Sequence, residues 1–401
     1  MRKRLLIAGL LALACFAAGA QQRYIRRVPP LPFAHLERNA LQFPGGESPA
    51  FERFLGKLDT LIVTGRGDVR ILHIGGSHVQ AGTWTGQLRK DLLSLRYGMD
   101  GGRGLVFPCT AAATNTPSSY RSAYTGEWTH SKCLKPESVM GLCGMAVTTQ
   151  DTTASVIIDL ADAEHRPWTT RFSFKQVDVL GYGELEPVLL MDRDTVRGRD
   201  EGGRWHFELP HYTDYVEVKF RGFPGRFTVE GLYLDRPTPG LTVSEAGVNG
   251  AATASWLRCE DLVRDMAFLR PDLVIFSIGI NDIQGPDFSR NRFISNYKAL
   301  IVRVQEAAPG CAMLFTVNND SWYHRAPNPF TREVEQAFEE LAAWFDAPLW
   351  DLYDIMGGFG SMQEWTAAGL GQSDKVHFTP EGYRLLGDLL FNAIMGCYNK
   401  R

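Results

Sequence analysis

Three short stretches of the 401-residue chain contain residues that could together carry out acyl transfer. Gly75-Gly76-Ser77-His78 supplies a serine hydroxyl, and Gly279-Ile280-Asn281-Asp282 supplies a side-chain amide. Asp374-Lys375-Val376-His377 supplies an imidazole and, before it, a carboxylate. Acyl transfer needs a nucleophile, a base, a group that orients the base, and hydrogen-bond donors for the oxyanion. The three stretches therefore offer a candidate for each of these roles.

The stretch that contains Ser77 has the sequence of a strand that ends in a tight turn. Residues 71–74 form an apolar run, and two glycines follow it directly. Residues 84–97, in which leucines recur at helical spacing, predict the next helix. Ser77 is therefore expected at the carboxyl end of a strand and near a helix N-terminus, where open α/β sheets bind ligands and amides favour negative charge. Glycine and serine are also ordinary turn residues with no chemical role.

Strands alternate with helices beyond residue 241, which predicts a parallel sheet covered by helices on both faces. The expected strands are 241–246, 273–278, 311–317 and 348–352. The expected helices are 48–61, 252–269, 293–308 and 331–345, with a last helix capped by Thr379. Asn281 thus follows a strand and His377 precedes the last helix. Asn281 could equally be a helix cap, and His377 could be a packed histidine.

Residues 110–240 have a different pattern, because apolar and polar residues alternate in segments such as 215–220 and 226–234. This alternation predicts half-buried strands rather than helices. We expect an antiparallel β-sandwich inserted into the α/β domain. Its aromatic residues, such as Trp128 and Tyr212, could stack on sugars or fill the core of the sandwich.

The first twenty residues have the pattern of a cleaved export signal. A basic start at residues 1–4 precedes an apolar run at residues 5–17, and Ala18-Gly19-Ala20 fits a cleavage site. Cys15 leaves a lipoprotein anchor as the alternative. Residues 21–47, which are polar and contain proline, predict an extended leader. The six cysteines after Cys15 could pair in an exported protein or stay buried as free thiols.

The composition excludes several other classes of function. A net charge of −3 provides no basic surface for nucleic acid. Beyond the signal, no apolar run is long enough to span a membrane. The chain has no Cys-x-x-Cys pair and no histidine-rich cluster, which argues against a structural metal.

In their order along the chain, the three stretches resemble the blocks of the SGNH (GDSL-type) hydrolase family. Residues 75–78 are similar to its first block, usually Gly-Asp-Ser, while residues 279–282 match Gly-x-Asn-Asp and residues 374–377 match Asp-x-x-His. The glycine block between them is best matched by Asn249-Gly250-Ala251-Ala252-Thr253, with Gly247 as the alternative glycine. The resemblance extends over roughly 61–108 and 241–401.

The resemblance implies a three-layer, flavodoxin-like parallel sheet and a serine esterase that needs no cofactor. Ser77 would be the nucleophile, His377 the general base, and Asp374 the group that orients the base. The oxyanion would be bound by the backbone amides of Ser77 and Gly250 and by the side-chain amide of Asn281.

The layout is similar to that of some secreted peptidoglycan O-acetylesterases of the family, which carry a sandwich after the first block. The expected parts are a signal peptide (1–20), an extended leader (21–47), a hydrolase domain (48–109 and 241–401) and a carbohydrate-module-like insert (110–240). The expected function is removal of O-acetyl groups from a cell-envelope or extracellular polysaccharide, in the periplasm or outside the cell. The alternatives are a lipase or thioesterase of the same family, or a non-catalytic glycan-binding protein on this scaffold.

One residue departs from the pattern of the family, because Gly76 stands where aspartate is usual. Its loss removes a carboxylate that could brace the turn, whereas glycine could permit a backbone conformation that aspartate resists. A second Asp-x-x-His spacing, at residues 162–165, is out of family order and is expected to be a surface turn. His73 is expected to be structural. His78 could touch substrate or merely pack, and is left out of the catalytic set.

Overall fold

The protein was studied in a computed structural model that describes residues 24–135, 139–160, 172–191, 194–222 and 224–401. The predicted export signal, Cys15 and the second Asp-x-x-His stretch at residues 162–165 lie outside these residues.

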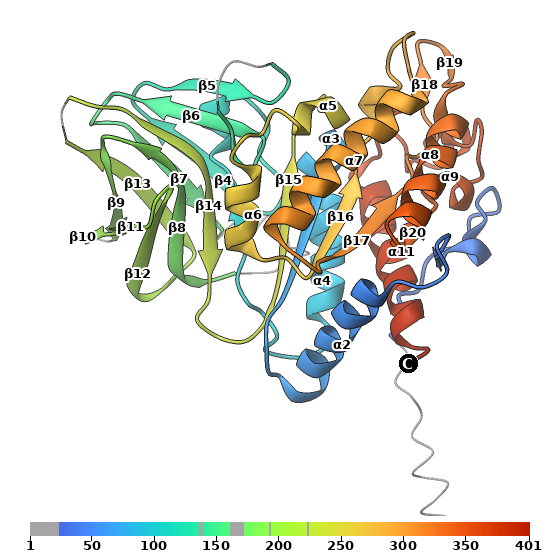
Figure 1. The fold of residues 1–401 in the computed structure, drawn as a ribbon, viewed down its shortest axis with the longest axis horizontal. Coiled ribbons are helices and arrows are strands. Elements are labelled where there is room, and N and C mark those ends of the chain that lie inside the picture. The colour runs from blue at the N-terminus through green and yellow to red at the C-terminus, as the bar shows by residue number, and fades with distance from the viewer. Residues whose placement is uncertain (1–23, 136–138, 161–171, 192–193, 223) are drawn as a thin grey trace, which may run out of the picture.

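A six-stranded sheet forms the centre of the α/β part (Figure 1). Its strands follow in the order β1 (Leu41–Gln42), β20 (Leu349–Trp350), β17 (Ala312–Thr316), β16 (Leu273–Ser277), β2 (Val69–Gly75) and β15 (Leu241–Gly247). The strands from β20 to β15 pair in parallel, so their carboxyl ends lie at the same edge. The parallel sheet predicted from the alternation of strands and helices is therefore confirmed.

Helices cover both faces of this sheet (Figure 1). On one face, Ile71 and Ile275 share an apolar cluster with α2 (Pro49–Thr64), α4 (Thr83–Leu93) and α11 (Pro380–Tyr398). On the other face, Leu72 and Val274 share a cluster with α6 (Leu262–Leu269), α7 (Arg290–Ala307) and α8 (Thr331–Trp344). Burial on both faces is the reason why these strands are continuous apolar runs in the sequence.

The helix predicted over residues 252–269 is interrupted, so that prediction was wrong in part. The structure has a short α5 (Thr253–Trp256) followed by α6. The guanidinium of Arg303 on α7 donates to the carbonyls of Leu257 at 3.1 Å and of Glu260 at 3.1 Å. These bonds satisfy carbonyls in the connecting turn, where a continuous helix would use its own N–H groups.

Six further short elements lie in the described α/β part: α3 (Ser77–Gln80), η3 (Ile280–Asp282), β18 (Trp322–Tyr323), β19 (Ala326–Pro327), α9 (Leu352–Ile355) and α10 (Met362–Ala367). Of these, α3 contains Ser77 and η3 contains Asn281.

The expected leader is built into the α/β part from Tyr24 onward. The backbone N–H of Arg26 donates to the side chain of Asn392 on α11, at 2.7 Å. After η1 (Leu36–Arg38), the leader contributes β1, which pairs antiparallel with β20 at the edge of the central sheet. A two-residue strand has no hydropathy pattern, so the sequence predicted only an extended segment here.

Two antiparallel sheets make up the insert (Figure 1). One has the order β10 (Asp194–Arg197), β9 (Glu186–Met191), β13 (Tyr215–Arg221), β7 (Ser155–Asp159) and β4 (Arg121–Thr125). The other has the order β11 (Arg199–Asp200), β12 (Arg204–Thr213), β8 (Phe174–Gly183), β14 (Phe227–Asp235), β6 (Met145–Thr149) and β5 (Thr129–Lys132). β3 (Gly104–Val106), which lies ahead of residue 110, also pairs with β14, and η2 (Cys109–Ala112) follows it.

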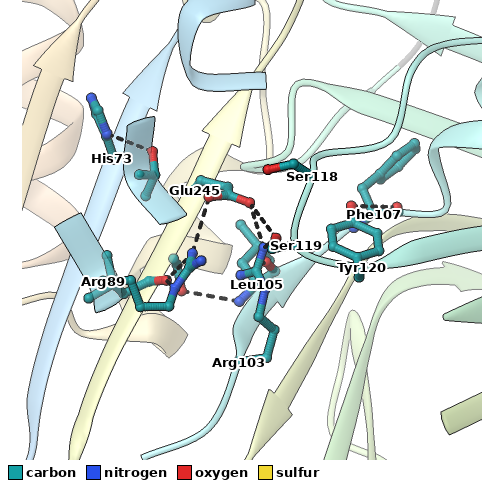
Figure 2. Close-up of polar contacts among 12 residues, drawn as sticks. His73, Arg89, Arg103, Leu105, Phe107, Ser118, Ser119, Tyr120 and Glu245 are labelled. Atoms are coloured by element: carbon teal, nitrogen blue, oxygen red, sulfur yellow. Dashed lines mark hydrogen bonds and ion pairs between the residues drawn. The ribbon is translucent and has the colours of Figure 1, made fainter. Parts of the chain in front are cut away.

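A buried ionic cluster joins the central sheet to the start of the insert. Figure 2 shows the carboxylate of Glu245, on β15, between the guanidinium groups of Arg89 and Arg103. Arg103 also donates to the hydroxyl of Ser119 at 2.7 Å. The apolar interior of the insert is continuous with the cluster on one face of the central sheet. The two parts therefore share one core.

Candidate active site

Ser77 is the first residue of α3, and Gly76 alone separates it from the end of β2. A Cβ at Gly75 would lie 2.3 Å from a methyl carbon of Val79 and 2.9 Å from the carbonyl oxygen of Ser277. Glycine at this position therefore lets α3 pack directly on the strand ends. As the first residue of a helix, Ser77 has a backbone N–H with no acceptor inside that helix. The predicted location of Ser77, at the carboxyl end of a strand and the start of a helix, is what the structure shows.

The side chains of Ser77, His377 and Asp374 form a hydrogen-bonded series. Nε2 of His377 lies 2.8 Å from Oγ of Ser77, and Nδ1 of His377 lies 2.7 Å from Oδ2 of Asp374. A carboxylate at Nδ1 fixes the tautomer in which Nδ1 carries the proton, so that Nε2 can accept the proton of the serine hydroxyl.

Asp374 is held by its own loop. Its Oδ1 accepts hydrogen bonds from the backbone N–H groups of Val376, at 2.9 Å, and His377, at 3.0 Å. Partial burial alone would raise the pKa of Asp374, but these backbone bonds and the contact with His377 outweigh it and leave the pKa below its usual value. Asp374 is therefore ionised at neutral pH and available as the partner of the imidazole.

Asn281 lies on η3 next to the turn that precedes Ser77. Its Nδ2 donates to the carbonyl oxygen of Ala251 at 3.0 Å, and a Cβ at Gly76 would lie 3.1 Å from the same nitrogen. The adjacent Asp282 accepts bonds from the backbone N–H of Thr253, at 3.0 Å, and from its hydroxyl, at 2.6 Å. The turn of residues 281–282 is thereby bonded to the loop of residues 250–253.

The two candidate glycines occupy different environments. Gly247 ends β15, and a Cβ there would lie 2.3 Å from the backbone nitrogen of Gln80. Gly250 is exposed and has a φ of +81°, which favours glycine. A Cβ at Gly250 would have no neighbour closer than the Leu134 side chain at 3.8 Å. Gly247 thus serves the close approach of α3, while Gly250 presents its backbone in an open loop.

Two polar residues that the sequence analysis did not single out hold this loop in place. The side chain of Gln80 accepts from the backbone N–H of Asn249 at 2.6 Å, and Nδ2 of Asn249 donates to Oδ1 of Asn115 at 2.6 Å. Gln80 lies one helical turn after Ser77, and this spacing is the feature of the sequence that could have predicted its place beside the site. Asn115 comes from the start of the insert, and local sequence patterns do not indicate contacts of this range.

Gly76 departs from the family pattern at a crowded position between β2 and α3. Its backbone has φ −92° and ψ −141°, a pair outside the main β and α regions. A Cβ would meet Nδ2 of Asn281 at 3.1 Å, a contact that requires a small shift of that amide.

His73 is a buried structural residue, as expected. Its ring nitrogens lie 2.8 Å from the hydroxyl of Thr85 and 2.7 Å from that of Ser277. Burial lowers the pKa of His73 to about 3, so the ring is neutral at working pH.

The cysteines are free thiols in the part of the chain that the structure describes, and Cys109, Cys133, Cys143 and Cys259 are buried. Of the two possibilities left open by the sequence, the structure contains the unpaired form. The described residues include no group of three or more His, Cys, Asp or Glu side chains placed to hold a metal ion. No helix among them has both the length and the apolar character needed to cross a membrane.

Comparisons with known proteins add to this geometry. Residues 209–385 match the model of the GDSL-like lipase/acylhydrolase family, a segment that contains Gly250, Asn281, Asp374 and His377, whereas Ser77 lies ahead of it. No curated protein sequence matches the chain.

Several solved structures are similar to the model. A peptidoglycan O-acetylesterase superposes with a TM-score of 0.76 and 23% identity, over 90% of this chain and 99% of that one. A lipase/acylhydrolase from Enterococcus faecalis has a TM-score of 0.32 and 23% identity, over 39% of this chain and 77% of its own. An acetyl xylan esterase has a TM-score of 0.32 and 20% identity, over 38% of this chain and 81% of its own.

A parallel sheet covered on both faces, with a serine, an imidazole and a carboxylate in contact beside it, is the build of a serine hydrolase. The segment that matches the GDSL-like lipase/acylhydrolase family model includes the C-terminal part of this sheet and helices that cover it. The fold of the chain as a whole, with its inserted β-sheets, is similar to that of the peptidoglycan O-acetylesterase on which it superposes.

Proposed function

We propose that the protein is an exported serine esterase that removes O-acetyl groups from a cell-envelope or extracellular polysaccharide. The observation that carries the proposal is the hydrogen-bonded series of Ser77, His377 and Asp374, contributed by segments far apart in the chain. Each distance is within the range that proton transfer and ring orientation need.

In the proposed reaction, Oγ of Ser77 attacks the carbonyl carbon of the acetyl ester while Nε2 of His377 takes its proton. The resulting oxyanion accepts hydrogen bonds from the backbone N–H groups of Ser77 and Gly250 and from Nδ2 of Asn281. Collapse of this intermediate breaks the ester bond to the sugar, and His377 gives the proton to the leaving sugar oxygen, which departs as a hydroxyl. Water, deprotonated by His377, then attacks the carbonyl carbon of acetyl-Ser77; the bond from that carbon to Oγ breaks, His377 returns the proton to Oγ, and acetate leaves.

The open position of the site is compatible with a polymeric substrate. The side chains of His377 and Asp374 are 33% and 46% exposed, so an acetyl group that projects from a long chain can reach the site without entering an enclosed channel. The choice of a glycan is supported by the likeness to a peptidoglycan O-acetylesterase, which extends over the insert as well as the α/β part.

Export is supported by the signal-like pattern of residues 1–20, which lie outside the described residues. The expected mature N-terminus is Gln21. Intact mass and N-terminal sequencing of the protein from the extracytoplasmic fraction would test this. A mature chain that begins with a lipid-modified Cys15 would replace the cleaved signal by a lipoprotein anchor.

The activity is tested by acetate release from O-acetylated peptidoglycan and from acetylated xylan, each measured with the mature protein and with Ser77→Ala. We expect release by the wild type that is lost in the variant, and the preferred polymer identifies the substrate class. A small activated ester, 4-nitrophenyl acetate, serves as a substrate that needs no glycan recognition. If neither polymer nor the small ester is hydrolysed, the proposed esterase function is wrong, and a glycan-binding protein becomes the better interpretation.

A further inference from the structure

A second imidazole lies directly beside that of His377. His78 follows Ser77 on α3 and is only 6% exposed. Its ring centroid is 5.1 Å from that of His377, and the two ring planes are tilted by 44°. The His377 side chain is one-third exposed, so one side of it meets solvent while His78 packs against it from the interior.

Residues of α11 and its N-terminal flank fix the orientation of His78. Its Nδ1 lies 2.7 Å from the hydroxyl oxygen of Tyr383, and its ring packs against the rings of Phe378 at 5.9 Å and Tyr383 at 5.7 Å. Burial raises the pKa of Tyr383, so its hydroxyl keeps its proton and can donate it to Nδ1. The proton of the neutral ring is then on Nε2, a buried atom without a hydrogen-bond partner among the described residues.

His78 stays uncharged at any pH at which the esterase could work. Burial, followed by the neighbouring His377, lowers the pKa of His78 to about 3, and the opposing effect of the Asp374 carboxylate is smaller. Among the described residues, His377, Asp374 and Tyr383 are the titratable groups that act on this ring. A neutral ring places no charge against the imidazolium that forms on His377 when it takes the serine proton. His78 is thus available as a packing surface and not as a second base.

The hydrogen bonds of His377 do not by themselves fix the tilt of its ring. The bonds of His377 to Asp374 and Ser77 lie in the plane of its ring, and Asp374 is itself 46% exposed. A planar ring held only by bonds in its plane can still tilt unless another group packs against it. His78 supplies such a contact, with its ring tilted by 44° against that of His377, and it is itself bonded to α11 rather than to the exposed loop.

We propose that His78 is a positioning residue, which holds the imidazole of His377 in the orientation that joins Ser77 to Asp374, and that Tyr383 holds His78 in turn. This inference rests on the proposed esterase function and assigns no chemical step to His78. Misplacement of a catalytic group by about 1 Å can cost about 100-fold in rate, so a supporting ring of this kind has a measurable effect.

The test compares three variants in the mature protein, with kcat and KM measured on 4-nitrophenyl acetate. His78→Ala removes the packing surface, and we expect kcat to fall about 10–100-fold with KM changed less than about twofold. His78→Phe restores a ring, and we expect it to recover much of the lost kcat. Tyr383→Phe removes only the bond to Nδ1, and we expect a loss of kcat smaller than that of His78→Ala.

Tyr398→Phe is the matched control. Tyr398 lies at the other end of α11, where its hydroxyl donates to Asp59 at 2.8 Å, so the variant removes the same kind of bond from the same helix. We expect its kcat to equal that of the wild type. A merely structural role of His78 would lower the melting temperature but leave kcat per folded molecule unchanged.

The outcomes separate this proposal from the proposed function. Wild-type kcat in His78→Ala and Tyr383→Phe, beside an inactive Ser77→Ala, would overturn the positioning role and leave the esterase standing. Equal losses in His78→Phe and His78→Ala would also overturn it, because a ring would then give no rescue. If His78→Ala does not fold, His78→Phe and Tyr383→Phe decide. A wild type that hydrolyses no ester and whose Ser77 is not labelled by a fluorophosphonate would overturn both proposals.

Discussion

The side-chain amide of Asn281 has two N–H groups, and the structure shows a partner for one of them. One N–H donates to the carbonyl of Ala251, which sets the orientation of the amide beside Gly76 and the start of α3. In the proposed mechanism, the other N–H donates to the oxyanion that forms at Ser77. The bond to Ala251 is present before any substrate binds, so the donor needs no rearrangement during the reaction.

We therefore expect Asn281→Ala to lower kcat about 10²–10³-fold with little change in KM, because the lost bond forms only as charge develops on the oxyanion. Initial rates with 4-nitrophenyl acetate provide the measurement. Asn392→Ala is the control, since it removes a side-chain amide on α11 that bonds to the backbone of Arg26. Equal rates for Asn281→Ala and the wild type would exclude Asn281 from the oxyanion site.

The residues whose positions the sequence predicted share a physical cause. Ser77 and His377 were predicted because each lies next to a regular element whose pattern is local. Gln80 and Asn115 were not predicted, because their effect depends on a contact between α3, the insert and the loop at Asn249. Such contacts leave no period in the sequence. Tyr383 likewise became relevant only when the fold placed it against His78.

At the scale of elements, the loop that follows β15 depends on the left-handed conformation of Gly250. Alanine there would cost about 1–2 kcal/mol in backbone strain, although the nearest side chain leaves room for its methyl group at 3.8 Å. Relief of that strain would rotate the backbone amide. We expect Gly250→Ala to lower kcat for 4-nitrophenyl acetate about 10–100-fold. The melting temperature of the variant is measured as well, to follow the loss of stability.

Gly202→Ala is the matched control for this prediction. Gly202 has a φ of +75° and no atom within 4 Å of a built Cβ, and it lies in the turn between β11 and β12 of the insert. It should show a similar loss of stability with an unchanged kcat. If both variants lose stability and neither loses activity, the Gly250 amide takes no part in catalysis.

Strands and helices were predictable where their burial produces a regular pattern of apolar residues in the sequence. β2 and β16 are buried on both faces, and their apolar runs identified them. The interruption between α5 and α6 was not predictable, because it depends on Arg303 from α7. The edge strand β1 was not predicted because it is short: two residues that pair with β20 are too few to show an alternation of apolar and polar residues.

At the scale of the whole molecule, the insert and the α/β part are joined through a shared apolar interior and through Glu245. The side chains of Glu245, Arg89 and Arg103 are at most 3% exposed, and both guanidinium groups contact the one carboxylate. Burial alone would raise the pKa of Glu245, but the charges of Arg103 and Arg89 outweigh it and leave the pKa below its usual value. Removing this carboxylate would leave two buried cations without their partner.

Glu245→Gln should therefore lower the free energy of unfolding by about 3–5 kcal/mol, measured by urea denaturation, because a broken buried ion pair leaves an uncompensated charge. Glu208→Gln, on a side chain that is 73% exposed, should change it by less than about 0.5 kcal/mol. Because the shared core couples the two parts, we expect one unfolding transition and a shift of its midpoint. A Glu245→Gln protein as stable as the wild type would show that the cluster is not needed to join them.

The lowered pKa of Glu245 also sets the sign of a pH dependence. Below the ordinary glutamate value of 4.5 the unfolded chain binds a proton at this residue that the folded protein does not, so the folded state loses stability as pH falls. Above that value the contribution is fully present and constant. The wild type should therefore lose more stability between neutral pH and pH 4 than Glu245→Gln does, and the two unfolding free energies should converge in acid. Parallel pH curves for the two proteins would contradict the assignment of a charged Glu245 to the junction.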